Sequence, residues 1–277
     1  NAAFAIASRI VIPLINLVSK HNWQGAHNIP KSGPVIVCCN HISYFDPLVF
    51  AHYLYKNGRA PRFLGKASVF RVPIVGFVLR KAGQVPVERE TKDAGAALVH
   101  AQAFLKAGHM LGVYPEGTLT RDANYWPMVA KTGLARLAVM TKAPVIPVAQ
   151  WGAQKVLPAY SKKFRIFPRT KLQVKAGAPL DFSKWYGKEG DPEAMAEATA
   201  YAMSAITEIL EEAVIDDHAL FPSALPARRE TSYNAWVTIQ IGCDNTCAYC
   251  IVPAVRGKEI SRPFADIVAE VESLAAQ

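Results

Sequence analysis

Short runs of apolar and β-branched residues recur along residues 34–176, and they constrain the fold more than any other feature. They lie at 35–39, 83–87, 109–114, 145–150 and 171–177. Runs that are apolar on both faces are typical of strands buried inside a sheet. Between them, residues 93–106 and 131–141 carry apolar side chains at helical spacing. Strands that alternate with helices predict an α/β fold with a central, largely parallel sheet flanked by helices.

Residues 2–18 are almost wholly apolar, although Arg9 and Pro13 interrupt them. A helix needs about 20 apolar residues to span a bilayer, so this run is too short. It also lacks the charged start and small-residue cleavage site of a signal peptide. Two interpretations are open, namely a helix lying in a membrane interface and an ordinary packing helix. We favour the first, and we expect residues 1–30 to associate with a membrane.

The charge of the chain is unevenly divided. Residues 1–205 carry a net charge of +15 and residues 206–277 carry −6, within a total of +9. A change of sign indicates two pieces with different partners, so we expect one domain over 31–212 and another segment over 213–277. Asp191 and Pro192 predict the start of a helix that reaches about Glu212. The five cysteines form two clusters rather than a secreted disulfide framework, which favours a reducing compartment.

A histidine and an aspartate follow the first of these strands. His41 and Asp46 are five residues apart, a step that would put them on different faces of a regular helix. His41 must therefore lie in the turn between strand and helix if Asp46 is to reach back to it. In such a pair the carboxylate orients the imidazole, whose other nitrogen can then take a proton from a hydroxyl. A loop histidine beside a capping aspartate is the alternative.

Two more polar segments follow predicted strands. Glu88 and Arg89 come after 83–87, and Glu116 comes just after 109–114. Open α/β sheets bind ligands at the carboxyl ends of their strands. The position of these groups favours a functional site over a capped loop.

Four blocks of the sequence resemble, in order and spacing, the motifs of glycerolipid acyltransferases, and especially bacterial 1-acylglycerol-3-phosphate acyltransferases. They are Asn40-His41…Asp46, VPVER at 85–89, YPEGT at 114–118 and VIPV at 145–148. The resemblance covers roughly residues 10–205. It implies transfer of a fatty acyl group from acyl-CoA or acyl carrier protein to the sn-2 hydroxyl of 1-acylglycerol-3-phosphate, giving phosphatidic acid.

The resemblance also implies roles for individual residues. His41 would be the general base and Asp46 its orienting partner, while Arg89 would bind the phosphate of the acceptor. Glu116 and Gly117 would shape the acceptor site. The remaining substrate-binding positions that it implies are Asn40, Lys66, Thr118 and Lys131.

The sequence departs from the family pattern after EGT. An arginine commonly follows there, whereas this chain has Leu119, and its nearest arginine is Arg121. Arg121 is therefore expected to replace the usual arginine only if the loop bends.

An acyl thioester is already activated, so the enzyme has to deprotonate an alcohol, position it and stabilise an oxyanion. We accordingly expect acyl transfer to need no metal or cofactor. A covalent intermediate on Cys38 or Cys39 is a rival mechanism, although buried free cysteines are common in apolar strands.

Residues 155–175 interleave cationic and aromatic side chains. Such patches are found at nucleic-acid surfaces, at anionic lipid surfaces and on solvated strands. The apolar amino terminus favours lipid, so the expected partners are a membrane surface and an anionic lysophospholipid. The expected location is the cytoplasmic face of the cell membrane, as a peripheral or monotopic protein.

Three cysteines, Cys243, Cys247 and Cys250, follow a predicted strand at 235–242. Three thiolates at this spacing can hold three irons of a 4Fe-4S cluster and leave the fourth open. A zinc site would need a fourth ligand, and His218 is the only histidine on this side.

Residues 215–277 resemble the start of the radical S-adenosylmethionine domain of tRNA methylthiotransferases. The resemblance implies a cluster, S-adenosylmethionine and tRNA as ligands. A single strand, cluster loop and helix (262–276) cannot bury their own apolar faces, so we expect this truncated β/α piece to be inactive alone. We interpret the join as an accidental chimera, and we expect deletion of the segment to leave acyl transfer within a few-fold of its rate.

Overall fold

The computed structural model describes residues 2–87, 94–122, 124–161, 163–217, 240–241 and 260–261. By its internal contacts the chain divides into two units, Asn1–Val214 and Ile215–Gln277. The predicted domain limits at 30/31 and 212/213 refer to function and stay predictions.

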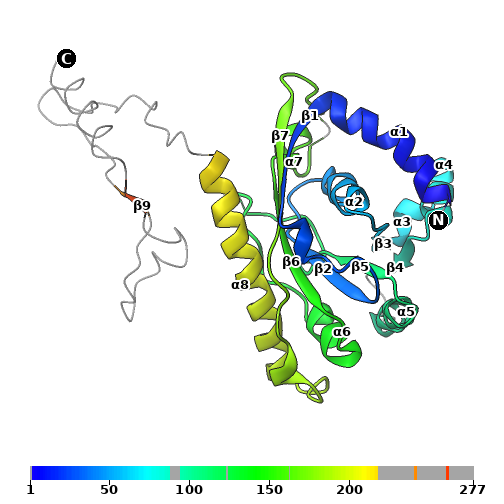
Figure 1. Cartoon of the computed structure of the whole chain (residues 1–277), viewed down its shortest axis with the longest axis vertical. Coiled ribbons are helices and arrows are strands. Elements are labelled where there is room, and N and C mark those ends of the chain that lie inside the picture. The colour runs from blue at the N-terminus through cyan, green and yellow to red at the C-terminus, as the bar shows by residue number, and fades with distance from the viewer. Residues whose placement is uncertain are drawn as a thin grey trace, which may run out of the picture. The chain divides into compact units, whose positions relative to one another are not determined.

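The first unit is built on a seven-stranded sheet (Figure 1). Its strands are β1 (Ser19–Gln24), β2 (Val35–Cys39), β3 (Arg62–Lys66), β4 (Val85–Val87), β5 (Met110–Val113), β6 (Val145–Trp151) and β7 (Thr170–Ala176). Their order across the sheet is β1-β7-β6-β2-β5-β3-β4. Neighbouring strands are parallel except for the pair β6 and β7. The prediction of a largely parallel sheet is therefore confirmed.

Helices cover both faces of this sheet. They are α1 (Ala2–Val18), α2 (Asp46–Lys56), α3 (Ala67–Phe70), α4 (Pro73–Lys81), α5 (Ala94–Lys106), α6 (Gly133–Thr141), α7 (Ala153–Val156) and α8 (Pro192–Asp217). Two 3-10 turns, η1 (Ala26–Asn28) and η2 (Ser183–Trp185), complete the elements of this unit. Helices α1, α2 and α7 pack on one face, and α5, α6 and α8 (yellow in Figure 1) pack on the other.

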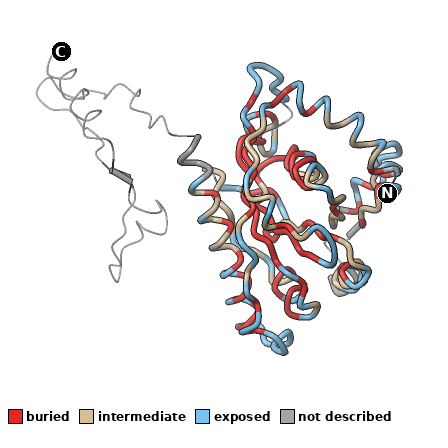
Figure 2. The backbone as a smooth tube through the Cα atoms, viewed as in Figure 1, coloured by how far each residue is buried: buried red, intermediate tan, exposed pale blue. Residues whose placement is uncertain are grey.

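Strand β2 shows how one run of residues supplies side chains to the hydrophobic cores on both faces of the sheet. Successive side chains of a strand point to opposite faces, so Val35, Val37 and Cys39 enter the core under α1 and α2. Ile36 and Cys38 enter the core under α5, α6 and α8. All five residues are buried, as Figure 2 shows for the centre of the sheet. The pattern explains why the run is apolar throughout rather than alternating.

The first helix, α1, has one buried and one exposed apolar face. Phe4, Ile15 and Val18 are buried, and Ile15 and Val18 belong to the core shared with α2. The exposed stripe consists of Ile6, Ile10, Leu14 and Leu17, which are about 60% exposed. Packing of α1 against the protein is thus established, while its contact with a membrane remains a proposal. None of the described helices is long and apolar enough to cross a bilayer.

Of the second unit, the structure describes two short strands, β8 (Gln240–Ile241) and β9 (Ile260–Ser261), which pair in antiparallel register. The rest of the predicted strand at 235–242, the predicted helix at 262–276 and the three cysteines lie outside the described residues.

Candidate active site

His41 and Asp46 meet in the turn that joins β2 to α2. His41 lies two residues beyond the end of β2, and Asp46 is the first residue of α2. His41 Nδ1 is 2.9 Å from Asp46 Oδ2. Because a carboxylate can only accept a hydrogen bond, this contact favours the tautomer of neutral imidazole that carries its proton on Nδ1 and has a lone pair on Nε2. The sequence-based expectation that Asp46 reaches back to His41 holds in the structure, and the roles of the pair in catalysis remain predictions.

Asp46 is held by more than the imidazole. Its Oδ2 also accepts hydrogen bonds from the backbone N–H groups of Ile42 and Ser43, at 2.6 and 2.7 Å. The side chain is fully buried. Burial raises the pKa of Asp46, whereas His41 and the two N–H groups lower it in part. The carboxylate is therefore fixed in position and poorly solvated, which suits a group that orients and stabilises a neighbouring imidazolium.

Glu116 links the site to the loop after β5. One carboxylate oxygen accepts from the backbone N–H of His41 at 2.9 Å, and the other accepts from that of Met128 at 3.0 Å. The side chain is buried, and burial raises its pKa. The resemblance implied that Glu116 shapes the acceptor site. In the structure Glu116 ties two backbone segments together, and its role at the acceptor site stays a prediction.

Tyr114 is a site residue to which sequence reasoning gave no role. Its ring stacks on the imidazole of His41, with centroids 4.1 Å apart and an interplanar angle of 19°. The Tyr114 ring also contacts the rings of Phe50 and Phe63. This stacking fixes one face of the imidazole. The sequence signal that could have identified Tyr114 was its position in the YPEGT block, at the end of a strand beside the strand that precedes His41.

Asn40 is buried beneath the site. Its amide Nδ2 donates to the carbonyl of Gln150, and its Oδ1 accepts from the backbone N–H of Gln150. The Gln150 side chain donates in turn to the carbonyl of Asn40. Both amide groups of Asn40 are therefore used within the protein, and the substrate-binding role that the resemblance implies for it stays a prediction. It joins the ends of β2 and β6 and so positions His41.

The turn after β5 brings Gly117 and Lys131 together. Gly117 has a φ of 71°, a conformation that favours glycine. A Cβ on Gly117 would lie 3.4 Å from the Lys131 side chain, which therefore passes over this turn. Thr118 is exposed beside it. Three of the residues implied by the resemblance thus gather next to Glu116.

The loop after EGT contains Leu119 and Arg121, where the sequence departs from the family pattern. Leu119 is buried, and its carbonyl accepts from the Tyr160 hydroxyl at 2.9 Å. Arg121 is exposed, and within the described part of the chain its guanidinium makes no recorded hydrogen bond. The backbone N–H of Thr120 donates to the carbonyl of His41, so this loop packs on the site through its backbone. The replacement of the family arginine by Arg121 stays a prediction.

Two cationic positions are described only in part. Lys66 ends β3 and pairs in register with Val87 of β4, but its side chain is not among the described ones. Arg89 follows β4 by two residues and lies outside the described residues. The backbone nevertheless places Lys66 at the same edge of the sheet as His41, because β2, β5 and β3 are parallel neighbours.

Cys38 and Cys39 are poor candidates for an acyl-cysteine. Both are fully buried in β2. Burial raises the pKa of Cys38 to about 12 and raises that of Cys39 well above its ordinary value. A thiol without access to substrate or base stays protonated and inert. The described residues also include no cluster of His, Cys, Asp or Glu that could hold a metal ion.

The chain is similar to known acyltransferases in sequence and in structure. Residues 20–151 match the sequence model of the acyltransferase family. This range includes all four motif blocks, and with them His41, Asp46 and Glu116. The crystal structure of the 1-acyl-sn-glycerophosphate (LPA) acyltransferase PlsC from Thermotoga maritima is similar, with a TM-score of 0.58 and 25% identity. The match covers 76% of this chain and 78% of that chain. The resemblance to glycerolipid acyltransferases is confirmed. The residues that match the family model all lie in the basic first part of the chain.

Other curated relatives match only a short stretch of this chain. A tRNA-2-methylthio-N(6)-dimethylallyladenosine synthase from Mycolicibacterium vanbaalenii is 63% identical over 57 residues, which are 21% of this chain and 11% of that protein. One from Corynebacterium diphtheriae is 51% identical over 67 residues, 24% of this chain and 13% of that protein. The second resemblance is thus also confirmed. The chain spans only about a tenth of the length of these relatives.

Proposed function

We propose that the chain transfers a fatty acyl group from acyl-CoA or acyl carrier protein to the sn-2 hydroxyl of 1-acylglycerol-3-phosphate, giving phosphatidic acid. The observation that carries this proposal is the 2.9 Å contact between His41 Nδ1 and Asp46 Oδ2 at the carboxyl end of β2. Appearance of phosphatidic acid, followed by mass spectrometry with lysophosphatidate and acyl-CoA as substrates, tests it. The thioester supplies the activated acyl group.

In the proposed reaction His41 and Asp46 handle the proton that moves from the acceptor to the leaving group. His41 Nε2 takes the proton of the acceptor hydroxyl while the oxygen of that hydroxyl attacks the thioester carbonyl. Asp46 stabilises the imidazolium that results, because its buried carboxylate lies against Nδ1. Collapse of the tetrahedral intermediate breaks the carbon–sulfur bond, and the imidazolium returns the proton to the leaving thiolate. The side chain of His41 is 14% exposed, so it is not closed off from solvent.

A membrane surface is the proposed setting. The apolar stripe of α1 continues onto the neighbouring helix α4, where Ile74 and Phe77 are 80% and 59% exposed. Exposed apolar residues gathered on adjacent helices are typical of an interfacial surface. Phe164 and Phe167, exposed among the cations of residues 155–175, add a second point of contact. We therefore propose a peripheral protein of the cytoplasmic face, bound to anionic lipid.

Acidic residues on the α1 stripe should release the protein from vesicles. The double variant Ile10→Glu, Leu14→Glu places two charges where apolar side chains would enter the interface, and we expect vesicle affinity to fall at least about tenfold. Both residues are about 60% exposed, so the fold should be retained. Co-sedimentation with vesicles measures the change. Val99→Glu, at an equally exposed position of α5, is the control, and equal binding of the double variant and the control would contradict the proposal.

The segment after α8 is proposed to be dispensable for acyl transfer. A chain that stops after Asp217 keeps the whole of α8, including Ile206 and Leu210, which are buried against the first unit. We expect its kcat/KM to stay within a few-fold of the full chain. Complete loss of activity in a truncated protein that remains folded would show that the segment takes part. Cluster, S-adenosylmethionine and tRNA binding through Cys243, Cys247 and Cys250 are proposals for that segment alone, to be tested by iron content after anaerobic reconstitution.

A further inference from the structure

The aromatic ring of Tyr114 lies face to face with the imidazole of His41. The ring centroids are 4.1 Å apart and the two planes differ by 19°. The backbone explains this approach, because Tyr114 follows β5 by one residue and His41 follows β2 by two. These strands are parallel neighbours, with Val113 of β5 paired to Cys38 of β2. The sheet therefore brings the two rings together.

Two further aromatic rings hold Tyr114 in this position. Phe63 of β3 is nearly parallel to it, with centroids 6.3 Å apart and an interplanar angle of 14°. Phe50 of α2 is inclined to it at 60°. Phe63 pairs in register with Gly112, and a Cβ on Gly112 would lie 2.2 Å from the Phe63 ring. The absence of a side chain at Gly112 thus gives Phe63 the room to pack beside Tyr114.

The hydroxyl group of Tyr114 is not the part that acts in the site. Its oxygen atom is fully buried. Burial, followed by the charge of Asp46, raises the pKa of Tyr114 well above its ordinary value. The phenol therefore stays neutral and has no access to substrate, which leaves the face of the ring as the part that acts on His41.

The face of an aromatic ring carries negative potential and attracts a cation that lies within about 6 Å of its centroid. In the proposed acyl transfer His41 becomes such a cation when it accepts the hydroxyl proton. Among the described residues, the titratable groups in contact with His41 are Asp46 at Nδ1, Glu116 at the backbone N–H, and Tyr114 itself. The ring face and the Asp46 carboxylate thus favour the same state of the imidazole, which is the imidazolium.

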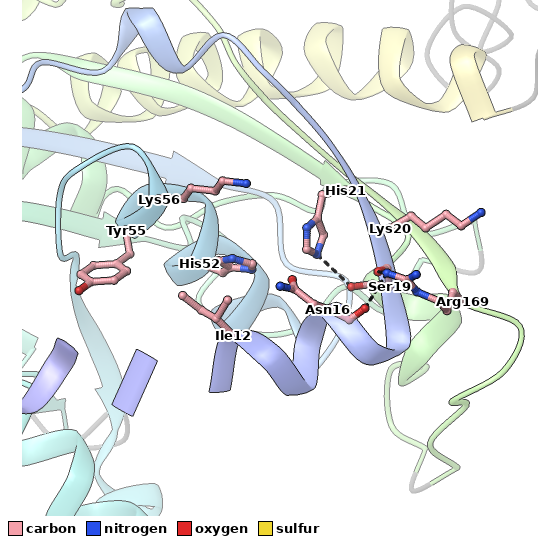
Figure 3. Close-up of a pocket in the computed structure, with 9 residues that line it drawn as sticks. All are labelled: Ile12, Asn16, Ser19, Lys20, His21, His52, Tyr55, Lys56 and Arg169. Carbon is pink, nitrogen blue, oxygen red and sulfur yellow. Dashed lines mark hydrogen bonds between the residues drawn. The ribbon is translucent and has the colours of Figure 1, made fainter. Parts of the chain in front are cut away.

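A second histidine stacks on an aromatic ring in the opposite electrostatic setting. His21 lines a cavity of about 600 Å³ between α1, β1 and α2, on residues outside the His41 site (Figure 3). Its ring centroid is 4.7 Å from that of Trp23, and the planes differ by 21°. Burial, followed by the charges of Lys56 and Arg169, lowers the pKa of His21. Stacking alone therefore does not decide the charge of a histidine, and at His41 a carboxylate takes the place of these cations.

We propose that Tyr114 is a positioning residue for acyl transfer, and that its ring face stabilises the imidazolium that His41 forms in the transition state. The inference deepens the proposed acyl transfer and rests on it. An interaction made with the imidazolium, and not with the substrate, acts on the transition state alone. It should therefore raise kcat and leave KM unchanged.

Fluorination of the ring tests this electrostatic role, because fluorine draws electron density from the ring face with little change of size. Phenylalanines with one, two and three ring fluorines are placed at position 114 of the full chain, beside Tyr114→Phe. We expect Tyr114→Phe to keep kcat within about threefold of the wild type. Along the fluorinated series we expect kcat to fall stepwise, by about tenfold at its end, with KM unchanged. Thermal melts check that every variant is folded.

Histidine NMR tests the same role without relying on acyl transfer. The imidazole resonances of His41, identified by their absence from His41→Ala, are followed against pH in each member of the series. A weaker ring face stabilises the imidazolium less, so we expect His41 to titrate at lower pH with each added fluorine, by about one pH unit in all. Asp46 and Glu116 are unchanged in every variant. His21 is the internal control, and its titration should stay constant because its ring stacks on Trp23.

The same fluorinated residues at position 182 are the matched control. Phe182 is 3% exposed and packs on Trp185 and Tyr201 in the core on the other face of the sheet. We expect fluorination there to change neither kcat nor the titration of His41.

A series at position 114 in which either kcat or the titration of His41 stays constant would overturn the proposal, while acyl transfer by the wild type would still stand. Absence of acyl transfer by the wild type would contradict the proposed function instead. The NMR series would then still decide whether the Tyr114 ring acts on the imidazolium of His41.

Discussion

Replacing His41 by alanine is expected to lower kcat/KM for acyl transfer by about 10²–10⁴-fold, the usual contribution of a positioned general base. The fold should survive the change. The hydrogen bonds from His41 to Glu116 and from Thr120 to His41 use the backbone of residue 41, which alanine keeps. Steady-state kinetics with acyl-CoA and lysophosphatidate, together with a thermal melt, measure both effects.

His100→Ala is the matched control for this prediction. His100 is an exposed residue of α5, which packs on the sheet through its other face. We expect wild-type kinetics from it. A His41→Ala protein that is folded and retains more than a tenth of the wild-type kcat/KM would contradict the assignment of His41 as the base.

Asp46→Asn should separate activity from stability. The amide oxygen can replace Oδ2 as the acceptor for Ile42 and Ser43, but a neutral side chain no longer stabilises the imidazolium of His41. The amide can also turn its NH₂ toward Nδ1 and impose the wrong tautomer. We therefore expect kcat to fall by about 10²–10⁴-fold, with a smaller change in KM.

The stability of the same variant should depend on pH in a defined direction. Burial raises the pKa of Asp46, so the folded state binds this proton more tightly than the unfolded state does. The stability contributed by the protonated carboxyl is complete below its unfolded pKa and is lost as pH rises through the folded pKa. Asparagine does not ionise, so the variant does not lose stability in this way as the pH rises. We expect the melting temperature of Asp46→Asn, relative to wild type, to increase between pH 4 and pH 7.5.

Asp191→Asn provides the control for both measurements. Asp191 caps α8 with bonds to the N–H groups of Glu193 and Ala194, and asparagine caps a helix equally well. Activity should be unchanged in this variant. A fall in the relative melting temperature of Asp46→Asn with rising pH would contradict the account of the buried carboxylate.

The central strands and long helices could be predicted because their signals are local. Strands β2 and β6 are buried along their whole length, so their sequences are apolar except for Gln150 near the end of β6. Strand β1 was missed because it is an edge strand paired only with β7, and its sequence SKHNWQ is polar and half-exposed. An edge strand needs backbone partners more than an apolar face.

Strand β3 was missed for a different reason. It pairs with β4 and β5, and the ring of Phe63 occupies the space above Gly112, where a Cβ would lie 2.2 Å from it. Complementarity between residues 49 positions apart leaves no local pattern.

The contacts of the candidate site also differ in whether a local sequence pattern predicts them. The contact of His41 with Asp46 follows from one turn and was predicted from spacing. The stacking of Tyr114 on His41 and the bonds of Asn40 to Gln150 depend on the order of β6, β2 and β5 in the sheet. The positions of Leu119 and Arg121 also depend on the packing of the loop after β5, which the motif alone did not specify.

Release of free thiol from acyl-CoA, measured with and without lysophosphatidate, tests the central claim most directly. The account predicts rapid release by the wild-type chain that depends on lysophosphatidate, is matched by phosphatidic acid formed, and is lost in His41→Ala. Release that does not depend on the acceptor, or that persists in His41→Ala, would contradict acyl transfer by this site.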